Sequence, residues 1–504
     1  MRIAASKPVF SRRFLAVLAG ALMLITALAG CSVNPATGEQ SFTAFMSPAD
    51  EIKVGSREHP KLVEQFGGSC DDKALDAYVK AVGARLAAVT EIPDLPYSFT
   101  LLNDEKINAF ALPGGFVHIT RGLLALADSE AEMAGVLAHE LGHITARHTA
   151  ERYSRAMATQ LGLAVLGVVG AAAGVPSEAG NLAAFGAQAW LQGFSREQEL
   201  EADMLGIRYM TRAGYDPAAM ASFFRKMDEF TRLQATLSGD PDAADRFSIM
   251  ASHPRTGDRV AQALQLTQGT RPQNARIGRD DYLSRLDGIL FGDHPDQGVR
   301  VGRDFLHPGL RIAFRVPPGF VMFNDPRQVV ARGPDGAIVV FDAAPAKDAR
   351  AAGNLPAYVG RTWGGKVGIR NVEAIRVNGM DGATGQTRAQ TKSGVRDVRL
   401  VAIREAPDRL YRFIFITKPE QTGALTTELQ RTTYSFRRLS EAEARAIKPL
   451  RVRVIDVRRG DTIGSLAARM PFDQYRQERF LALNGIAPNE RLAPGRRVKI
   501  VVQE

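Results

Sequence analysis

The sequence feature that most constrains this chain is the pentapeptide His139-Glu140-Leu141-Gly142-His143, which lies in an apolar helical pattern. Residues four apart on a helix share one face, so the imidazoles of His139 and His143 converge on one point. Glu140 lies about 100° around the helix from His139, where its carboxylate can reach a water molecule beside that point. The pattern therefore predicts a zinc-binding helix with a carboxylate base next to the metal.

Two helices are expected to build this site. The first begins at Ser129 and runs to about Arg147, since Ser129 and Glu132 have the spacing of a capping box. The second covers 194–210 and places Glu199 and Asp203 four residues apart on one face. One of these carboxylates can ligate zinc while the other accepts the free N–H of a ligating histidine.

The two helices together resemble the gluzincin metallopeptidase family of the CAAX prenyl protease, HtpX and BepA. The likeness covers about residues 34–265, and the segments that carry it besides HExxH are Glu199-Leu200-Glu201-Ala202-Asp203, Asn34-Pro35-Ala36-Thr37-Gly38, Asn108-Ala109-Phe110-Ala111, Pro113-Gly114-Gly115 and His253-Pro254. The N-terminal lipoprotein-type signal (described below) and the absence of repeated membrane-spanning segments resemble the periplasmic lipoprotein members, BepA and LoiP.

This resemblance implies one Zn²⁺ per chain, with His139, His143 and Glu199 as ligands. It implies catalysis by Glu140, and Asp203 as the group that orients a ligand. Glu197 and Glu201 rival Glu199 by composition, and the four-residue spacing to Asp203 selects Glu199.

The metzincin arrangement does not fit the sequence. It needs a glycine and a third histidine where this chain has Ala146 and Thr149, and His148 is one residue out of register. We therefore expect His148 to be an exposed cation at the C-terminus of its helix.

Three strands are expected before the zinc helix, at 97–102, 108–112 and 116–120, with the first two read as a hairpin-like stretch. The resemblance implies that the second is an edge strand along the cleft. An extended substrate could then pair with Asn108, Ala109, Phe110 and Ala111. The alternative is an ordinary core hairpin.

His253 lies beyond both helices, and Pro254 biases it toward an extended loop conformation. By composition alone it is a surface histidine. The resemblance implies a gate: a fourth zinc ligand at rest, or an oxyanion donor when it moves aside.

The N-terminus resembles a bacterial lipoprotein signal, with a basic start, an apolar run over 14–28 and Leu28-Ala29-Gly30-Cys31. We expect residues 1–30 to be removed and Cys31 to carry lipid, although a plain secretory site with a chance cysteine is the alternative. Ser32 indicates sorting to the outer membrane. Cys70 is then a free, inert thiol.

The expected fold is multidomain. A tether (31–50) leads to a mainly α-helical gluzincin domain with a small β-sheet (51–265), a helical linker (266–299) and an α+β domain of unknown role (300–440). Residues 451–504 resemble a LysM-like βααβ module, a family that binds glycans of peptidoglycan. The apolar stretch 161–175 is expected to be a buried helix, with a lid or a membrane-touching segment as the alternative.

Composition excludes several classes of protein. With 504 residues, 45% hydrophobic, the chain is neither disordered nor polytopic, and the net charge of +10 comes with no nucleic-acid-binding motif. The leading expectation is a lipid-anchored periplasmic zinc endopeptidase acting on misfolded or misassembled envelope polypeptides. The alternatives are an assembly factor or chaperone of the outer-membrane assembly machinery with a largely closed metal site, and a glycan-binding adaptor.

Overall fold

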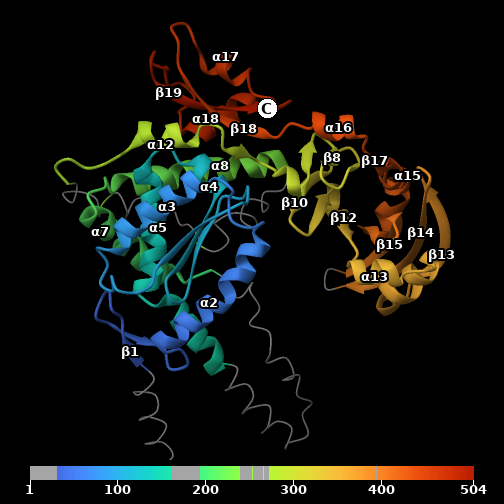
Figure 1. Ribbon diagram of the computed structural model, residues 1–504, viewed down its shortest axis with the longest axis horizontal. Helices are drawn as coiled ribbons and strands as arrows, with labels where there is room; N and C mark the ends of the chain where they lie inside the picture. Colours follow the sequence, from blue (N-terminus) through green and yellow to red (C-terminus); the bar gives the residue numbers. More distant parts are fainter. Residues whose placement is uncertain (1–30, 160–192, 239–252, 254–264, 266–271, 392–393) are drawn as a thin grey trace, which may run out of the picture.

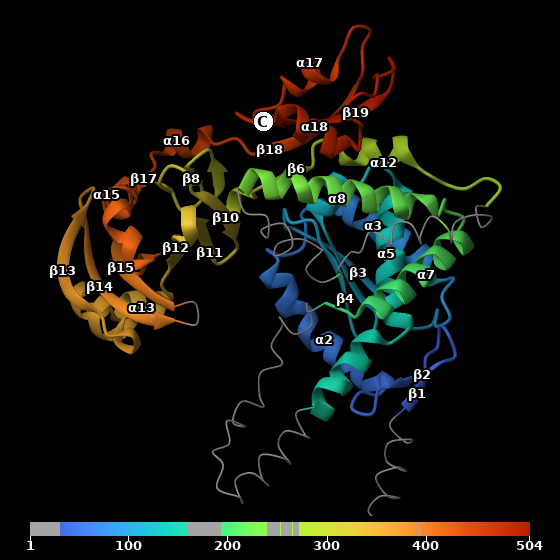
Figure 2. The same cartoon turned by 180° about the vertical axis from the view of Figure 1, so that it is seen from behind.

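The computed structural model describes residues 31–159, 193–238, 253, 265, 272–391 and 394–504. The expected signal peptide (1–30) and the apolar stretch 161–175 lie outside these residues. Figure 1 shows a helical N-terminal part, a β-rich part beside it, and a C-terminal unit that lies over helix α8 (Ala218–Ser238). Figure 2 shows the same arrangement from behind.

A three-stranded sheet lies next to helix α5 (Glu130–Thr145), which carries His139 and His143. Its strands β3 (Ser98–Leu102), β4 (Ala109–Leu112) and β5 (Phe116–Thr120) occupy the expected positions. The hairpin-like reading of the first two is wrong, because β5 lies between them, parallel to β3 and antiparallel to β4. The turn between β4 and β5 requires Gly114, which has φ +79°, and where a Cβ would lie 2.5 Å from the Ile52 backbone.

Helix α5 (Glu130–Thr145) is the centre of the helical part, and all of its residues are buried. It packs against α3, α7, α8 and β4. Because α5 is buried on every side, its charged and imidazole side chains must find partners inside the protein. The helices of this part are α2 (Pro48–Gln65), α3 (Lys73–Ala87), α4 (Arg121–Leu126), α5, α7 (Arg196–Arg212), α8 and α12 (Arg279–Leu286).

The β-rich part consists of two antiparallel sheets and helix α15 (Pro419–Ser435), in agreement with an α+β domain. Along β12 (Ile338–Ala343), Val339 and Phe341 are buried and alternate with more exposed residues, as successive residues of a strand do. The sheet orders are β10-β11-β12-β16-β15-β14-β13 and β17-β9-β8-β7.

The strands of these two sheets are β7 (Val299–Val301), β8 (Asp304–His307), β9 (Ile312–Arg315), β10 (Val321–Asp325), β11 (Gln328–Arg332), β12, β13 (Arg370–Val377), β14 (Met380–Thr391), β15 (Gly394–Ala406), β16 (Arg409–Thr417) and β17 (Arg437–Arg438). The short helices α13 (Ala346–Ala351) and α14 (Leu355–Ala357) lie between β12 and β13, and α16 (Glu441–Ala446) leads from β17 to the C-terminal unit. Buried aromatic rings, among them Phe314 and Phe413, fill the core between the sheets and α15.

The C-terminal unit has the order strand, helix, helix, strand: β18 (Leu450–Asp456), α17 (Ile463–Ala467), α18 (Arg476–Asn484) and β19 (Arg497–Gln503). Strand β6 (Leu290–Phe291) adds to this sheet by pairing with β18. The segment expected as a helical linker thus supplies α12 and also a strand of the C-terminal unit. The unit is therefore joined to the helical part by backbone hydrogen bonds as well as by the chain.

No helix in the described ranges is both long and apolar enough to cross a bilayer.

Candidate metal centre

Helix α5 begins where the sequence predicts. Ser129 is the N-cap, and its hydroxyl accepts a hydrogen bond from the Glu132 amide. The reciprocal half of the capping box is absent, because the Glu132 carboxylate accepts instead from the Asp128 amide and the Ser222 hydroxyl. The cap still fixes the start of the helix, and so sets which face carries His139 and His143.

Two glycines let α5 and α7 approach closely. A Cβ on Gly142 would lie 2.9 Å from the Ala202 carbonyl oxygen, and one on Gly206 would lie 3.1 Å from the His139 backbone nitrogen. Because neither residue has a side chain, α7 can bring its acidic face against the histidines of α5.

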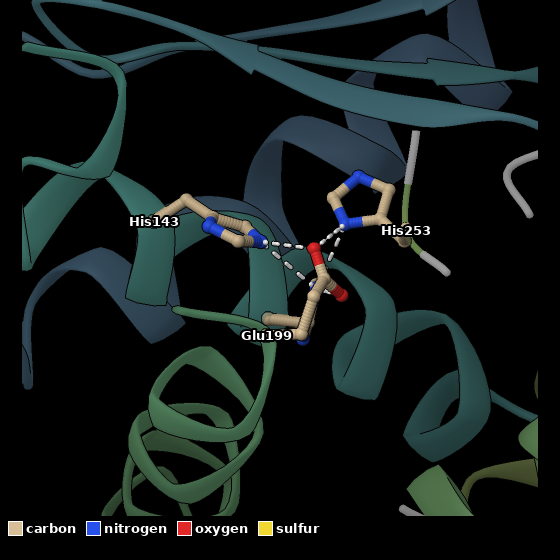
Figure 3. A group of neighbouring side chains, drawn as sticks. His143, Glu199 and His253 are labelled. Atoms are coloured by element: carbon tan, nitrogen blue, oxygen red, sulfur yellow. Dashed lines mark hydrogen bonds and ion pairs between the residues drawn. The ribbon is translucent and has the colours of Figure 1, made fainter. Parts of the chain in front are cut away.

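Four side chains meet between these helices: His139 and His143 of α5, Glu199 of α7, and His253. Their candidate ligand atoms lie within 4.8 Å of one another, and all four residues are buried. The two Nε2 atoms of His139 and His143 are 3.1 Å apart, and His253 Nδ1 lies 2.9 Å from Glu199 Oε1. Figure 3 shows His143, Glu199 and His253 converging from three segments of the chain.

This donor set fits a tetrahedral metal ion. Ligand atoms about 2.0–2.1 Å from a tetrahedral zinc are about 3.3 Å from one another. The Glu199 oxygens lie 3.5 Å from His139 Nε2 and 3.5 Å from His143 Nε2, and His139 Nε2 lies 3.2 Å from His253 Nδ1. Three imidazole nitrogens and one carboxylate are N and O donors of the kind that zinc takes, so these four residues could hold it.

Asp203 lies behind the cluster. Its Oδ1 is 2.9 Å from His139 Nδ1, the ring nitrogen that points away from the cluster. Such a contact orients the ring and leaves Nε2 as the donor toward a metal. The rivals of Glu199 lie elsewhere: Glu197 is exposed, and Glu201 faces His148.

The expectation that His148 is exposed is wrong. The chain turns at Arg147, which has φ +58°, and this turn folds His148 back beneath the site. His148 is 1% exposed, and its Nδ1 lies 2.8 Å from His143 Nδ1. Helical periodicity does not predict this contact, because residues five apart do not share a helix face.

Glu140 is buried beside the cluster, with its Oε1 3.3 Å from His253 Nε2. Burial raises the pKa of Glu140, while His253, His139 and the backbone amide of Ala111 act to lower it. A carboxylate whose proton affinity is raised toward neutral pH is suited to general acid–base chemistry.

Strand β4 is an edge strand among the described residues and packs against α5. Ala109 and Ala111 are buried, and the backbone of Asn108 is held by Thr120. The ring of Phe110 stacks on His118 and packs against Phe66, so this side chain is part of the core on the α2 side. Of the four residues predicted to meet a substrate, Phe110 therefore could offer only its backbone.

Phe194 is a neighbour that the sequence analysis missed. Its ring is stacked on His143, with centroids 3.9 Å apart, and the Arg152 guanidinium lies 4.5 Å over the same ring. This stack covers one face of the imidazole and restricts how the His143 ring can tilt.

The two cysteines lie apart from the cluster. Cys31 begins strand β1 (Cys31–Val33), which pairs with β2 (Gln40–Phe42). Cys70 is a buried free thiol, as expected, and burial raises its pKa, which makes it unreactive.

Comparison with known proteins adds a family assignment to this geometry. Residues 73–267 match Peptidase family M48, and residues 455–501 match the LysM domain. The chain is 31% identical over 285 residues to the beta-barrel assembly-enhancing protease of Escherichia coli, covering 52% of this chain and 55% of that protein.

Two further relatives match the chain over shorter lengths. The beta-barrel assembly-enhancing protease of Yersinia pestis is 34% identical over 226 residues, 43% of each chain. The mitochondrial metalloendopeptidase OMA1 of Schizosaccharomyces pombe is 36% identical over 217 residues, 42% of this chain and 59% of that protein. The chain spans about half the length of the curated relatives it matches. It therefore contains a peptidase family M48 domain, which holds the cluster described above, followed by a LysM domain.

Proposed function

We propose that the protein is a lipid-anchored zinc endopeptidase that hydrolyses misfolded or misassembled proteins of the bacterial envelope. The observation that carries the proposal is the buried set His139, His143 and Glu199, with Glu140 beside it and the edge of β4 alongside. The names of the relatives, a metalloendopeptidase and a protease that enhances β-barrel assembly, support the activity and the class of client.

When bound to these residues, zinc supplies Lewis-acid chemistry, in that it lowers the pKa of water and polarises a carbonyl. Glu140 accepts the proton of the attacking water and returns it to the leaving amine. Burial raises the pKa of Glu140, which favours uptake of the proton from water. The backbone of β4 pairs with an extended substrate and holds the scissile bond over the cluster.

The experiment is to measure zinc content and casein cleavage in parallel. Glu140→Gln should keep zinc and abolish cleavage, because it removes only the proton acceptor. His143→Ala and Glu199→Gln should lose both. Asp203→Asn should cost about 10–100-fold in metal affinity or activity. Full zinc occupancy in Glu199→Gln would refute the ligand assignment.

We also infer that His253 closes the site at rest. Its Nδ1 lies among the ligand atoms and its Nε2 faces Glu140, so it lies where water and substrate must enter. His253→Ala should raise proteolysis and make the metal more accessible to chelators. Loss of turnover with zinc retained would instead indicate an oxyanion donor. If neither activity nor chelator sensitivity changes, His253 has no role at the site.

The same contacts favour the alternative of an assembly factor whose metal site stays largely closed. A strain that carries Glu140→Gln distinguishes the assembly factor from the endopeptidase. If it assembles outer-membrane proteins as well as the wild type, assembly does not need proteolysis, and the enzyme proposal fails for that role.

The location and the other partners are part of the proposal. Cys31→Ser should release the protein from the outer membrane into the soluble periplasm. Residues 451–504 should mediate retention on purified peptidoglycan, because LysM is a glycan-binding family. Absence of retention would leave this unit as a docking domain.

A further inference from the structure

The two histidines of α5 are supported in different ways. For each ring the Nε2 atom points into the cluster and the Nδ1 atom points out. His139 Nδ1 meets a carboxylate directly, that of Asp203 at 2.9 Å. His143 Nδ1 meets a second imidazole, that of His148, at 2.8 Å.

Proton positions follow from this geometry. A ligating His143 must leave Nε2 without a proton, so its Nδ1 carries one and donates to His148 Nδ1. His148 then accepts at Nδ1 and carries its own proton on Nε2. That N–H points at Glu201 Oε2, 3.1 Å away, which can accept it. His143, His148 and Glu201 can therefore each act as donor or acceptor in this series without conflict.

This series of hydrogen bonds extends from Glu201 to the N-terminal segment. The side-chain amide of Asn34 donates to Glu201 Oε1 at 2.8 Å, and Asn34 is 3% exposed. Its own oxygen accepts from the Ala36 amide at 2.9 Å, which fixes the direction of the amide group. Glu201 is therefore held from both sides, by His148 and by a residue three positions after Cys31.

A second set of contacts fastens the same segment. The Arg147 guanidinium donates to the hydroxyl of Ser32, to the Met46 carbonyl oxygen and to Glu51. Arg147 is the residue whose left-handed conformation folds His148 toward His143. That conformation is unfavourable in a residue other than glycine, so it persists because surrounding contacts determine it.

We propose that His148 and Glu201 are positioning residues for the metal ligand His143, and that Asn34 makes the N-terminal segment next to the lipid site part of this support. The inference rests on the zinc centre proposed above. It predicts that a residue remote from the metal, on the segment that leads to the membrane, sets zinc affinity through three hydrogen-bonded side chains.

The test measures the zinc dissociation constant by competition with a chromophoric chelator. His148→Ala and Glu201→Ala should each weaken zinc binding about 10–100-fold, the range for residues that orient a ligand. Glu201→Gln keeps the shape and one acceptor oxygen and should weaken binding less. Asn34→Ala should weaken it several-fold. The matched control is Glu197→Ala, an exposed carboxylate on the same helix, which should change nothing.

Two further readouts separate positioning from general damage to the fold. The double variant His148→Ala/Glu201→Ala should bind zinc no more weakly than His148→Ala, because Glu201 acts through His148. The ligand-field bands of the Co²⁺-loaded protein should shift in His148→Ala and stay unchanged in Glu197→Ala.

The outcomes are distinguishable from those of the zinc proposal itself. If the wild type binds no zinc, or His143→Ala binds it as well as the wild type, the metal centre is wrong. If the wild type binds zinc and His148→Ala and Glu201→Ala bind it equally well, the positioning role is overturned. Multiplicative effects in the double variant would also overturn it.

Discussion

A buried histidine on β5 should make the helical part sensitive to mild acid. His118 is 0% exposed, and burial, together with the neighbouring His59, lowers its pKa from 6.5 to about 3. Below pH 6.5 the unfolded chain binds a proton at this residue while the folded protein does not, so stability falls as the pH falls. One proton corresponds to about 1.4 kcal/mol per pH unit. Between pH 8 and pH 5, His118 alone should therefore cost about 2 kcal/mol of unfolding free energy.

The assay uses Cys70 as a probe of the same core. This thiol is buried and its amide bonds to Leu101 of β3, so it becomes reactive only when the sheet opens. Urea unfolding of Cys31→Ser protein, followed with a disulfide reagent that reacts in acid, gives the free energy at each pH. His118→Gln removes the titrating group and should flatten the pH dependence by about 2 kcal/mol over this range. If both proteins lose stability in parallel, the reasoning is refuted, whatever the absolute stability of the variant.

Three substitutions test packing and docking by their effects on unfolding and on zinc binding. Gly142→Ala should cost about 1–3 kcal/mol and weaken zinc binding, because its Cβ would press on the Ala202 carbonyl; an unchanged zinc affinity would contradict the close approach of α5 and α7. Gly423→Ala, in exposed helix α15 with nothing near its Cβ, should stabilise by about 0.5–1 kcal/mol in a denaturation curve, and destabilisation would count against that helix. Lys499→Met should cost about 3 kcal/mol and expose β19 to proteases, because it removes a buried cation from Asp128, whereas the exposed Lys448→Met should do neither.

The parts of the site that the sequence predicted are those that one helix can place. His139, Glu140 and His143 have positions fixed by the helical period, and the same holds for Glu199 and Asp203 on α7. Helical periodicity alone does not predict that α5 and α7 pack against each other. It depends on small residues at both contact points, whose role appears only when the backbones are in place.

The support of His143 could not be predicted from local rules. His148 follows a left-handed residue after the end of α5, and no helical or strand period extends through such a turn. Its partner Glu201 looked like one of several acidic residues on α7, and the bond from Asn34 joins residues 167 apart in the chain. Long-range polar contacts of this kind have no pattern in the sequence, although the burial of His148 and Asn34 makes those side chains costly to leave unpaired.

The sheet order next to the site was also beyond the sequence pattern. Alternation and the Pro-Gly-Gly turn placed all three strands, but alternation says nothing about which strands are neighbours. The central position of β5 leaves β4 at the edge next to α5, and this is the arrangement that a substrate strand would need.

The C-terminal unit shows how a module that is recognisable in the sequence can still be an integral part of another domain. The Lys499 ammonium group is fully buried and donates to the carbonyl oxygens of the C-terminal turn of α4, those of Ala125 at 2.8 Å, Leu126 at 2.9 Å and Ala127 at 2.8 Å. It also pairs with Asp128, the residue before the N-cap of α5. A shift of β19 would thus remove a cation and three hydrogen bonds next to the first turn of the helix that carries His139 and His143. These contacts join β19 to the residues that lead into α5, although 374 residues separate Lys499 from Ala125 in the chain.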